Sequence, residues 1–235
     1  EKNEEDLEKR NLQETLTTLP WVKKGGDQGS MANDQVEFSV MHWGPCVVQT
    51  KVEQDVLSNL YAEAMRSKKD AGGELAGLLD TQIFLEDKEK FSSFFGVVFQ
   101  MYNHSLTNFG KKFTTPPKYV LDKLWCNFQK QHDFNPPHSH GGALSFVIYL
   151  KIPDELVKEN KKYRGQSIGP GGISFHYGDA KDYSIVNHSF FPKEGDMFIF
   201  PAWLTHWVYP YRSRCTRVSV SGNIIDKVKL SDLKE

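Results

Sequence analysis

The feature that most restricts the fold is a succession of short apolar segments that fills the C-terminal half of the chain. Each segment has the length and the β-branched or aromatic content of a strand, and Gly, Pro and Asp residues separate it from the next. Since no long helical segments lie between them, a doubly wound parallel sheet is disfavoured, and a mainly β antiparallel sandwich or barrel is predicted. The seven predicted strands are 119–128, 143–152, 172–177, 183–187, 195–200, 205–209 and 214–224.

Helical periodicity precedes these strands. One predicted helix begins at Gln54, and a second covers 91–102 with an aromatic stripe. We expect both helices to flank a sheet from outside, with the aromatic stripe in the core, because large apolar side chains usually lie there. Two edge strands are predicted before them, at 36–41 and 46–52. The residues predicted to share one side of the first helix are Leu57, Leu60, Tyr61, Ala64 and Met65.

The length of 235 residues suits one domain with an appended arm. Residues 1–34 begin with a charged segment and end in a Gly-rich linker, so we predict an N-terminal arm there. Residues 35–235 then form a single domain, with a helical buttress over about 53–110 and a strand core over about 119–225. Residues 154–171 are predicted to be a polar loop that overhangs the site.

Composition argues against several functional classes. The net charge of −1 gives no basic excess for binding nucleic acid, and no apolar run is long enough to cross a bilayer. The three cysteines, Cys46, Cys126 and Cys215, are scattered and odd in number, unlike a secreted disulfide framework. We therefore expect a soluble, cytoplasmic protein without nucleic-acid or membrane partners, and the sequence leaves a homodimer open.

Three histidines form the strongest candidate site. His138 and His140 precede the apolar run 143–152 and are two positions apart, so both side chains point off one face. His206 follows a Gly-Asp turn, an apolar strand and a bend at Pro201. Three ligands on one face suit a mononuclear Fe(II) site with positions left for substrates. For His138 and His140 the alternative is a pair of loop histidines bonded to backbone groups.

A candidate anion receptor lies beyond the third histidine. Arg217 and Ser219 alternate along one strand, so they share a face, and a guanidinium fork matches the two oxygens of a carboxylate. The alternative for Arg217 is a structural salt bridge at the sheet edge. Tyr149 could reach a cosubstrate, but it has the opposite parity to His138, so it is expected to face away unless a bulge intervenes. His176 is a weaker candidate for the substrate side.

Several motifs resemble those of the Fe(II)- and 2-oxoglutarate-dependent dioxygenases, and most closely those of oxygenases found in bacteria and marine phages. They are Asn-Pro-Pro-His138-Ser-His140, Gly195-Asp-Met-Phe-Ile-Phe-Pro with His206, and Arg217-Val-Ser219. The resemblance covers about residues 119–225. It implies a double-stranded β-helix (a jelly roll, cupin-like) with flanking helices, and an oxidoreductase that uses Fe(II), 2-oxoglutarate and O₂.

The resemblance also implies roles for individual residues. His138 and His206 would bind iron, and Arg217, helped by Ser219, would hold the distal carboxylate of 2-oxoglutarate. Asn127 is a further candidate contact of the cosubstrate. His140 stands where the family usually has Asp or Glu, so it either completes a three-histidine face or does not contact the metal.

The implied reaction is hydroxylation of an unknown primary substrate with release of succinate and CO₂. A cupin-like metal protein with non-oxidative chemistry or simple ligand binding is the alternative. A jelly-roll binding module with incidental histidines is the third possibility.

Overall fold

The computed structural model describes residues 17–20, 35–38 and 44–228, and it divides the chain into two compact units. The first unit comprises residues 1–44 and 104–112, and the second comprises 45–103 and 113–235. In the first unit, β1 (Thr17–Pro20) pairs with β2 (Gln35–Phe38) as an antiparallel two-stranded sheet. Most of the predicted N-terminal arm lies outside the described residues, so its boundary at residue 34 stays a prediction.

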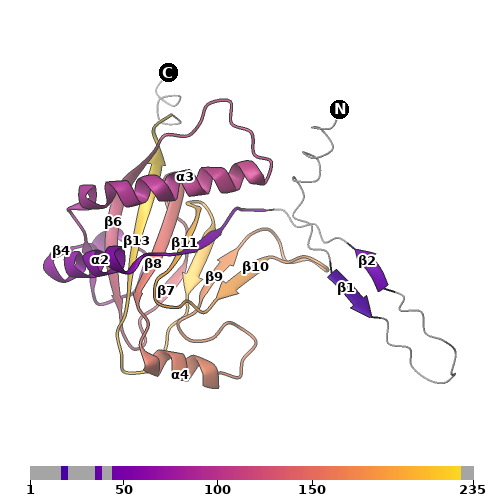
Figure 1. The fold of residues 1–235 in the computed structure, drawn as a ribbon. Coiled ribbons are helices and arrows are strands. Elements are labelled where there is room, and N and C mark those ends of the chain that lie inside the picture. Colours follow the sequence, from indigo (N-terminus) through magenta and orange to yellow (C-terminus); the bar gives the residue numbers. More distant parts are fainter. Residues whose placement is uncertain (1–16, 21–34, 39–43, 229–235) are drawn as a thin grey trace. The chain divides into compact units, whose positions relative to one another are not determined.

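The second unit contains two antiparallel sheets (Figure 1). The larger sheet has seven strands in the order β3-β11-β8-β13-β6-β5-β4, and the smaller has the order β10-β9-β12-β7. The strands are β3 (Val48–Lys51), β4 (Lys69–Asp70), β5 (Gln82–Phe84), β6 (Tyr119–Gln129), β7 (Asn135–His138), β8 (Leu144–Lys151), β9 (Ile173–His176), β10 (Asn187–Phe190), β11 (Asp196–Pro201), β12 (Thr205–Val208) and β13 (Arg217–Asp226). The predicted mainly β antiparallel architecture is confirmed.

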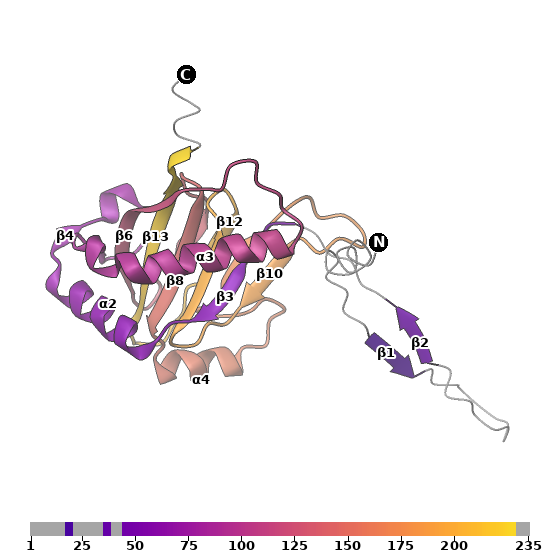
Figure 2. The same ribbon diagram turned by 45° about the horizontal axis from the view of Figure 1, so that its top comes forward.

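The helices α2 (Gln54–Arg66) and α3 (Ser92–Asn108) cover the larger sheet. In both views they lie against the same face of that sheet (Figures 1 and 2). Phe95 of α3 is buried and packs on Phe146 of β8, with 4.8 Å between ring centroids. The aromatic stripe therefore belongs to the core, as predicted. Two short 3₁₀ turns, η1 (Gly72–Glu74) and η2 (Lys88–Phe91), complete this layer.

The predicted apolar side of α2 was too wide. Leu57, Leu60 and Ala64 are buried, as expected. Tyr61 and Met65, however, are 36% and 62% exposed. The buried positions follow a stripe with spacings of three and four residues, and Tyr61 and Met65 each stand one residue past it.

The prediction of a polar loop at residues 154–171 was wrong in its first half. Helix α4 (Asp154–Lys162) begins after Pro153 and has a single buried side chain, Leu156. Acidic residues in its first turn and lysines in its last turn complement the helix dipole. In the sequence, this charged segment is typical of a solvated loop, because one buried side chain gives too little apolar periodicity to indicate a helix.

The strand predicted at 183–187 lies later in the chain, at β10. Tyr183 is fully exposed and has a φ of +65°, which is incompatible with an extended strand. The edge strand predicted at 36–41 overlaps β2, which pairs with β1 and not with the larger sheet. None of the described helices combines the length and apolar content required to span a membrane.

Candidate active site

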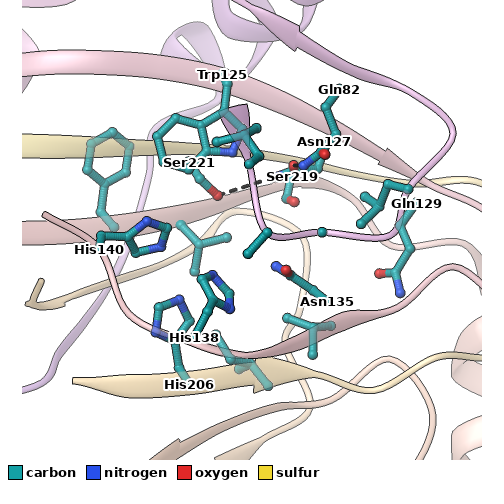
Figure 3. A pocket seen from close by; sticks show the side chains of 18 of the residues that line it. Gln82, Trp125, Asn127, Gln129, Asn135, His138, His140, His206, Ser219 and Ser221 are labelled. Carbon is teal, nitrogen blue, oxygen red and sulfur yellow. Dashed lines mark hydrogen bonds between the residues drawn. The ribbon is translucent and has the colours of Figure 1, made fainter. Parts of the chain in front are cut away.

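The smaller sheet brings the three predicted histidines together. His138 ends β7, and His206 lies directly opposite it on β12. His140 follows β7, and its backbone N–H donates to the carbonyl of Ala202, at 2.8 Å. One ring nitrogen of each histidine lies within 4.8 Å of those of the other two. Figure 3 shows the three rings gathered at one end of the pocket, which we call the histidine end.

Hydrogen bonds to the backbone fix two of the rings. Nδ1 of His138 lies 2.6 Å from the carbonyl oxygen of Pro136, and Nδ1 of His206 lies 2.9 Å from that of Leu204. Since a carbonyl oxygen only accepts, each Nδ1 must carry the proton, and each Nε2 keeps a free lone pair. This tautomer is the one that a metal-binding histidine uses when its other nitrogen is held by the protein.

Burial keeps these rings neutral. Burial, together with the neighbouring His138, lowers the pKa of His206 to about 3 and that of His140 to about 4. Desolvation by burial also lowers the pKa of His138. Within the described residues, this is the group of His, Cys, Asp and Glu side chains placed to share a metal ion, and it contains no carboxylate.

A buried guanidinium also lines the pocket. Arg217 is 4% exposed, and its Nη1 donates to the carbonyl of Gly171, at 3.0 Å. Its Nε has no hydrogen-bond partner, and the ion pairs of the described residues include none with Arg217. The structural salt bridge considered for Arg217 is therefore not formed within this part of the chain.

Tyr149 lies beside this guanidinium, which corrects the prediction that it faces away. The guanidinium carbon of Arg217 is 5.3 Å from the centre of the Tyr149 ring, and both side chains line the pocket with Ser219. We call these three residues the arginine end. The parity argument failed because His138 belongs to the smaller sheet and Tyr149 to the larger one, with a turn between them. In addition, the pairing of β8 with β13 shifts register between Val218 and Ser219.

Asn127 lies in the same pocket, where it pairs across the sheet with Ser219. Its Oδ1 accepts a hydrogen bond from Nε2 of Gln82, at 2.7 Å, and its Nδ2 donates to Oγ of Ser221, at 3.3 Å (Figure 3). The sequence interpretation had missed Gln82, Asn135 and Ser221. Strand alternation after Arg217 and Ser219 would have found Ser221. Asn135 opens the Asn-Pro-Pro-His138 motif but was not singled out from it, and no comparable pattern indicated Gln82.

The aromatic rings around His206 come from other strands, and the prediction for His176 needs correction. Trp203 is 55% exposed and contacts Tyr177, and the rings that pack on His206 are Phe175 and Phe200. His176 is bonded to Asn187 and does not line the pocket. The sequence gives neighbours along the chain, whereas these contacts come from facing strands.

Residues 123–223, which hold all six predicted site residues, match the sequence model of the family described as "Putative 2OG-Fe(II) oxygenase". Over this segment the chain is similar to the 2OG-Fe(II) oxygenase family. Enzymes of this family are oxidoreductases that use Fe(II), 2-oxoglutarate and O₂. No curated protein matches the chain in a comparison of sequences.

Solved structures of prolyl hydroxylases are similar to most of the chain. A Trichoplax adhaerens prolyl hydroxylase in complex with a hypoxia inducible factor peptide fragment is 11% identical, with a TM-score of 0.51 over 80% of this chain and 86% of that chain. A Pseudomonas putida prolyl-4-hydroxylase is 15% identical, with a TM-score of 0.48 over 77% of this chain and 92% of that chain. The first likeness confirms the predicted double-stranded β-helix.

Proposed function

We propose that this protein is a 2OG-Fe(II) oxygenase, a dioxygenase that hydroxylates a primary substrate and releases succinate and CO₂. The observation that carries the proposal is one pocket lined by two unlike groups. Three neutral imidazoles form its histidine end, and a buried guanidinium without a counterion forms its arginine end. The first suits a divalent metal ion and the second suits a carboxylate, and 2-oxoglutarate has the groups to bridge them.

The histidine end fits Fe(II). Borderline metal ions bind imidazole nitrogen well, and three such donors on one side leave positions for other ligands. The ring nitrogens of His138 and His206 are oriented by the backbone, and that of His140 lies within the same 4.8 Å group. We therefore assign all three as iron ligands. With no carboxylate in the set, the metal centre would be one charge unit more positive than in the usual His-Asp-His arrangement.

The arginine end fits the distal carboxylate of 2-oxoglutarate. The unpaired Nε of Arg217 and the unpaired hydroxyl of Tyr149 are both buried donors, and Ser219 adds a hydroxyl beside them. A carboxylate would satisfy these donors and neutralise the guanidinium, which the ring of Tyr149 cannot do. Asn127, opposite Ser219, would border the cosubstrate.

The oxidising chemistry would come from Fe(II), which together with 2-oxoglutarate activates O₂ for attack on a C–H bond. The chain's own contribution is to hold and orient these reactants. The histidines present neutral donors without a rearrangement of their backbone, and burial of the arginine end excludes water from the charge pair.

The test is anaerobic addition of Fe(II) and then 2-oxoglutarate, with the visible metal-to-ligand charge-transfer band as the readout. We expect a band that is lost in His206→Ala and weakened in Arg217→Met. The matched controls are His176→Ala and Arg214→Met, since His176 and Arg214 lie outside the pocket. Both controls should keep the band.

Bound metal without a band would overturn the proposal. It would favour the cupin-like alternative, a metal protein of the same fold without oxidative chemistry. Absence of metal binding altogether would leave only the binding-module interpretation.

A further inference from the structure

One wall of the pocket is built from uncharged amides, and the proposed chemistry does not use all of them. Gln82 on β5 and Asn127 on β6 belong to the larger sheet, whereas Asn135 on β7 belongs to the smaller one. In Figure 3 these side chains lie between the histidines and Gln129. Two sheets thus contribute amides to the same space.

Two of these amides have an oxygen with no partner. Gln82 is only 3% exposed, yet its Oε1 accepts no hydrogen bond, and Oδ1 of Asn135 is likewise buried and unpaired. Asn127 differs, since both ends of its amide are engaged, by Gln82 and Ser221. Folded proteins pair nearly all of their buried polar atoms, so unpaired acceptors that face a cavity indicate a ligand.

The segment Leu75–Leu79 brings its backbone close to these amides. A Cβ on Gly77 would lie 3.2 Å from Nε2 of Gln82 and 3.4 Å from Oδ1 of Asn135. It would also lie 2.5 Å from Cδ1 of Leu79, the end of a side chain that would have to shift, so a Cβ at this position would crowd the amides. Leu78 is tied to Phe134 by two backbone hydrogen bonds, of 2.8 and 3.2 Å. Gln82 and Asn135 therefore lie near each other, and both lie next to the backbone of Gly77.

The charges of the pocket restrict what these amides could bind. Of the residues that line it, Arg217 alone carries a formal charge at pH 7, and no Asp, Glu or Lys is among them. A carboxylate would meet acceptor oxygens at Gln82 and Asn135, and an ammonium group would find no counterion. A neutral group with N–H donors fits best. Because a side-chain amide offers both a donor and an acceptor, its natural complement is another amide.

We propose that Gln82 and Asn135 bind a primary carboxamide of the substrate, which directs the neighbouring carbon atoms toward the histidine end. This inference rests on the proposed function and names the substrate class that it leaves open. The carboxamide could be the side chain of Asn or Gln in a peptide, or that of a small molecule. The shared chemistry is a planar group with an NH₂ beside a carbonyl.

The test uses ligand-observed NMR on the full chain without added metal, with acetamide as the probe. Acetone is the matched comparison, because it has nearly the same shape and the same carbonyl but no N–H donor. We expect saturation transfer to acetamide and much weaker transfer to acetone. Gln82→Met and Asn135→Leu, which nearly keep the side-chain shape, should each weaken acetamide binding by about tenfold.

Gln49→Met is the control, since it makes the same chemical change on an exposed position of β3. It should bind acetamide as the wild-type chain does. Circular dichroism and thermal unfolding of each variant separate lost binding from lost folding. If Gln82→Met fails to fold, Gly77→Ala provides a second variant, which should hinder acetamide by crowding Gln82 and Leu79.

Equal transfer to acetamide and acetone, or acetamide binding that survives in both pocket variants, would overturn the inference. Since this experiment contains neither iron nor 2-oxoglutarate, its failure is independent of the charge-transfer band. A band without acetamide binding would keep the dioxygenase and reject the carboxamide site. Comparing acetamide with N-acetyl-asparagine N-methylamide, with the same variants, then shows whether a free amide or a peptide side chain binds more tightly.

Discussion

The histidine end and the arginine end of the pocket satisfy their polar groups in opposite ways. At the histidine end, the backbone holds two Nδ1–H groups and burial keeps the rings neutral. At the arginine end, a buried positive charge has one carbonyl partner, an unpaired Nε and an unpaired tyrosine hydroxyl beside it.

This difference indicates how each end affects the folding stability of the chain in the absence of ligands. A neutral imidazole with one hydrogen bond is tolerated in a protein interior, whereas an unpaired buried charge is destabilising. The histidine end is therefore preformed at little cost. The arginine end gives up stability that a carboxylate would restore, so ligand binding and folding stability should be coupled mainly there.

The largest expected effect is at the histidine end. His206→Ala should lower the affinity for Fe(II) by at least about 100-fold, because loss of an outer partner of a metal ligand already costs about 10–100-fold. Anaerobic equilibrium dialysis measures the affinity, and His176→Ala is the control. Wild-type affinity in His206→Ala would mean that the metal binds elsewhere.

Arg217→Met should lower the affinity for the cosubstrate and leave the affinity for the metal unchanged. We expect the affinity for 2-oxoglutarate to fall by about 2–5 kcal/mol, as for other buried hydrogen-bonded charge pairs that lose one partner. Titration of the charge-transfer band measures this, while Fe(II) binding should stay unchanged. A parallel loss of metal affinity would contradict the separation of the two ends.

The same substitution should make the ligand-free chain more stable. Methionine fills much of the space of the arginine stem without an unpaired charge, so the free energy of unfolding should rise by about 1–4 kcal/mol. Urea unfolding of the ligand-free chain measures it. A less stable Arg217→Met chain would show that Arg217 contributes to folding through its contacts with Gly171 and Tyr149.

Glu159 provides a comparison with Arg217, because it is a half-buried charge that already has hydrogen-bond donors around it. It accepts hydrogen bonds from the backbone N–H groups of Arg212 and Ser213 and from the Ser213 hydroxyl. We expect Glu159→Ala to lower the free energy of unfolding by about 1–3 kcal/mol at pH 7. Urea unfolding that shows no loss would remove Glu159 as a satisfied counterpart to Arg217.

The pH dependence of this effect follows from the pKa of Glu159. Burial by itself would raise that pKa, but the hydrogen bonds from Ser213 and Arg212 outweigh it and hold the pKa below its ordinary value of 4.5. A lowered pKa in the folded state gives stability that is present above pH 4.5 and is lost as the pH falls through the folded-state value. The difference between wild type and Glu159→Ala should therefore shrink in acid.

The smallest expected effect is that of Ser219→Ala. Removal of one neutral hydroxyl beside the guanidinium should lower the affinity for 2-oxoglutarate by about 0.5–1.5 kcal/mol, with no change in Fe(II) binding. Titration of the charge-transfer band again measures it. An effect as large as that of Arg217→Met would shift the main role in carboxylate binding from Arg217 to Ser219.

Several features of this protein follow from the sequence alone. Short apolar segments between Gly and Pro turns indicate an antiparallel sandwich or barrel, since packed sheets bury such segments. Strand alternation places Arg217 with Ser219, and the two-residue spacing places His138 with His140. The family motifs lie in the same stretches and led to the oxygenase family.

Tertiary structure decided what those local patterns cannot express. Tyr149 reaches Arg217 for two reasons. The alternation of side chains in one sheet does not carry over to the other sheet, and the pairing of β8 with β13 shifts register near Tyr149. Gln82 and Asn135 belong to different sheets, and they lie near each other because the backbone of Gly77 lies next to both. Local periodicity reports which face of its own element a side chain occupies, and it carries no information about which element lies opposite. The physical reason is that contacts between sheets depend on packing between distant segments.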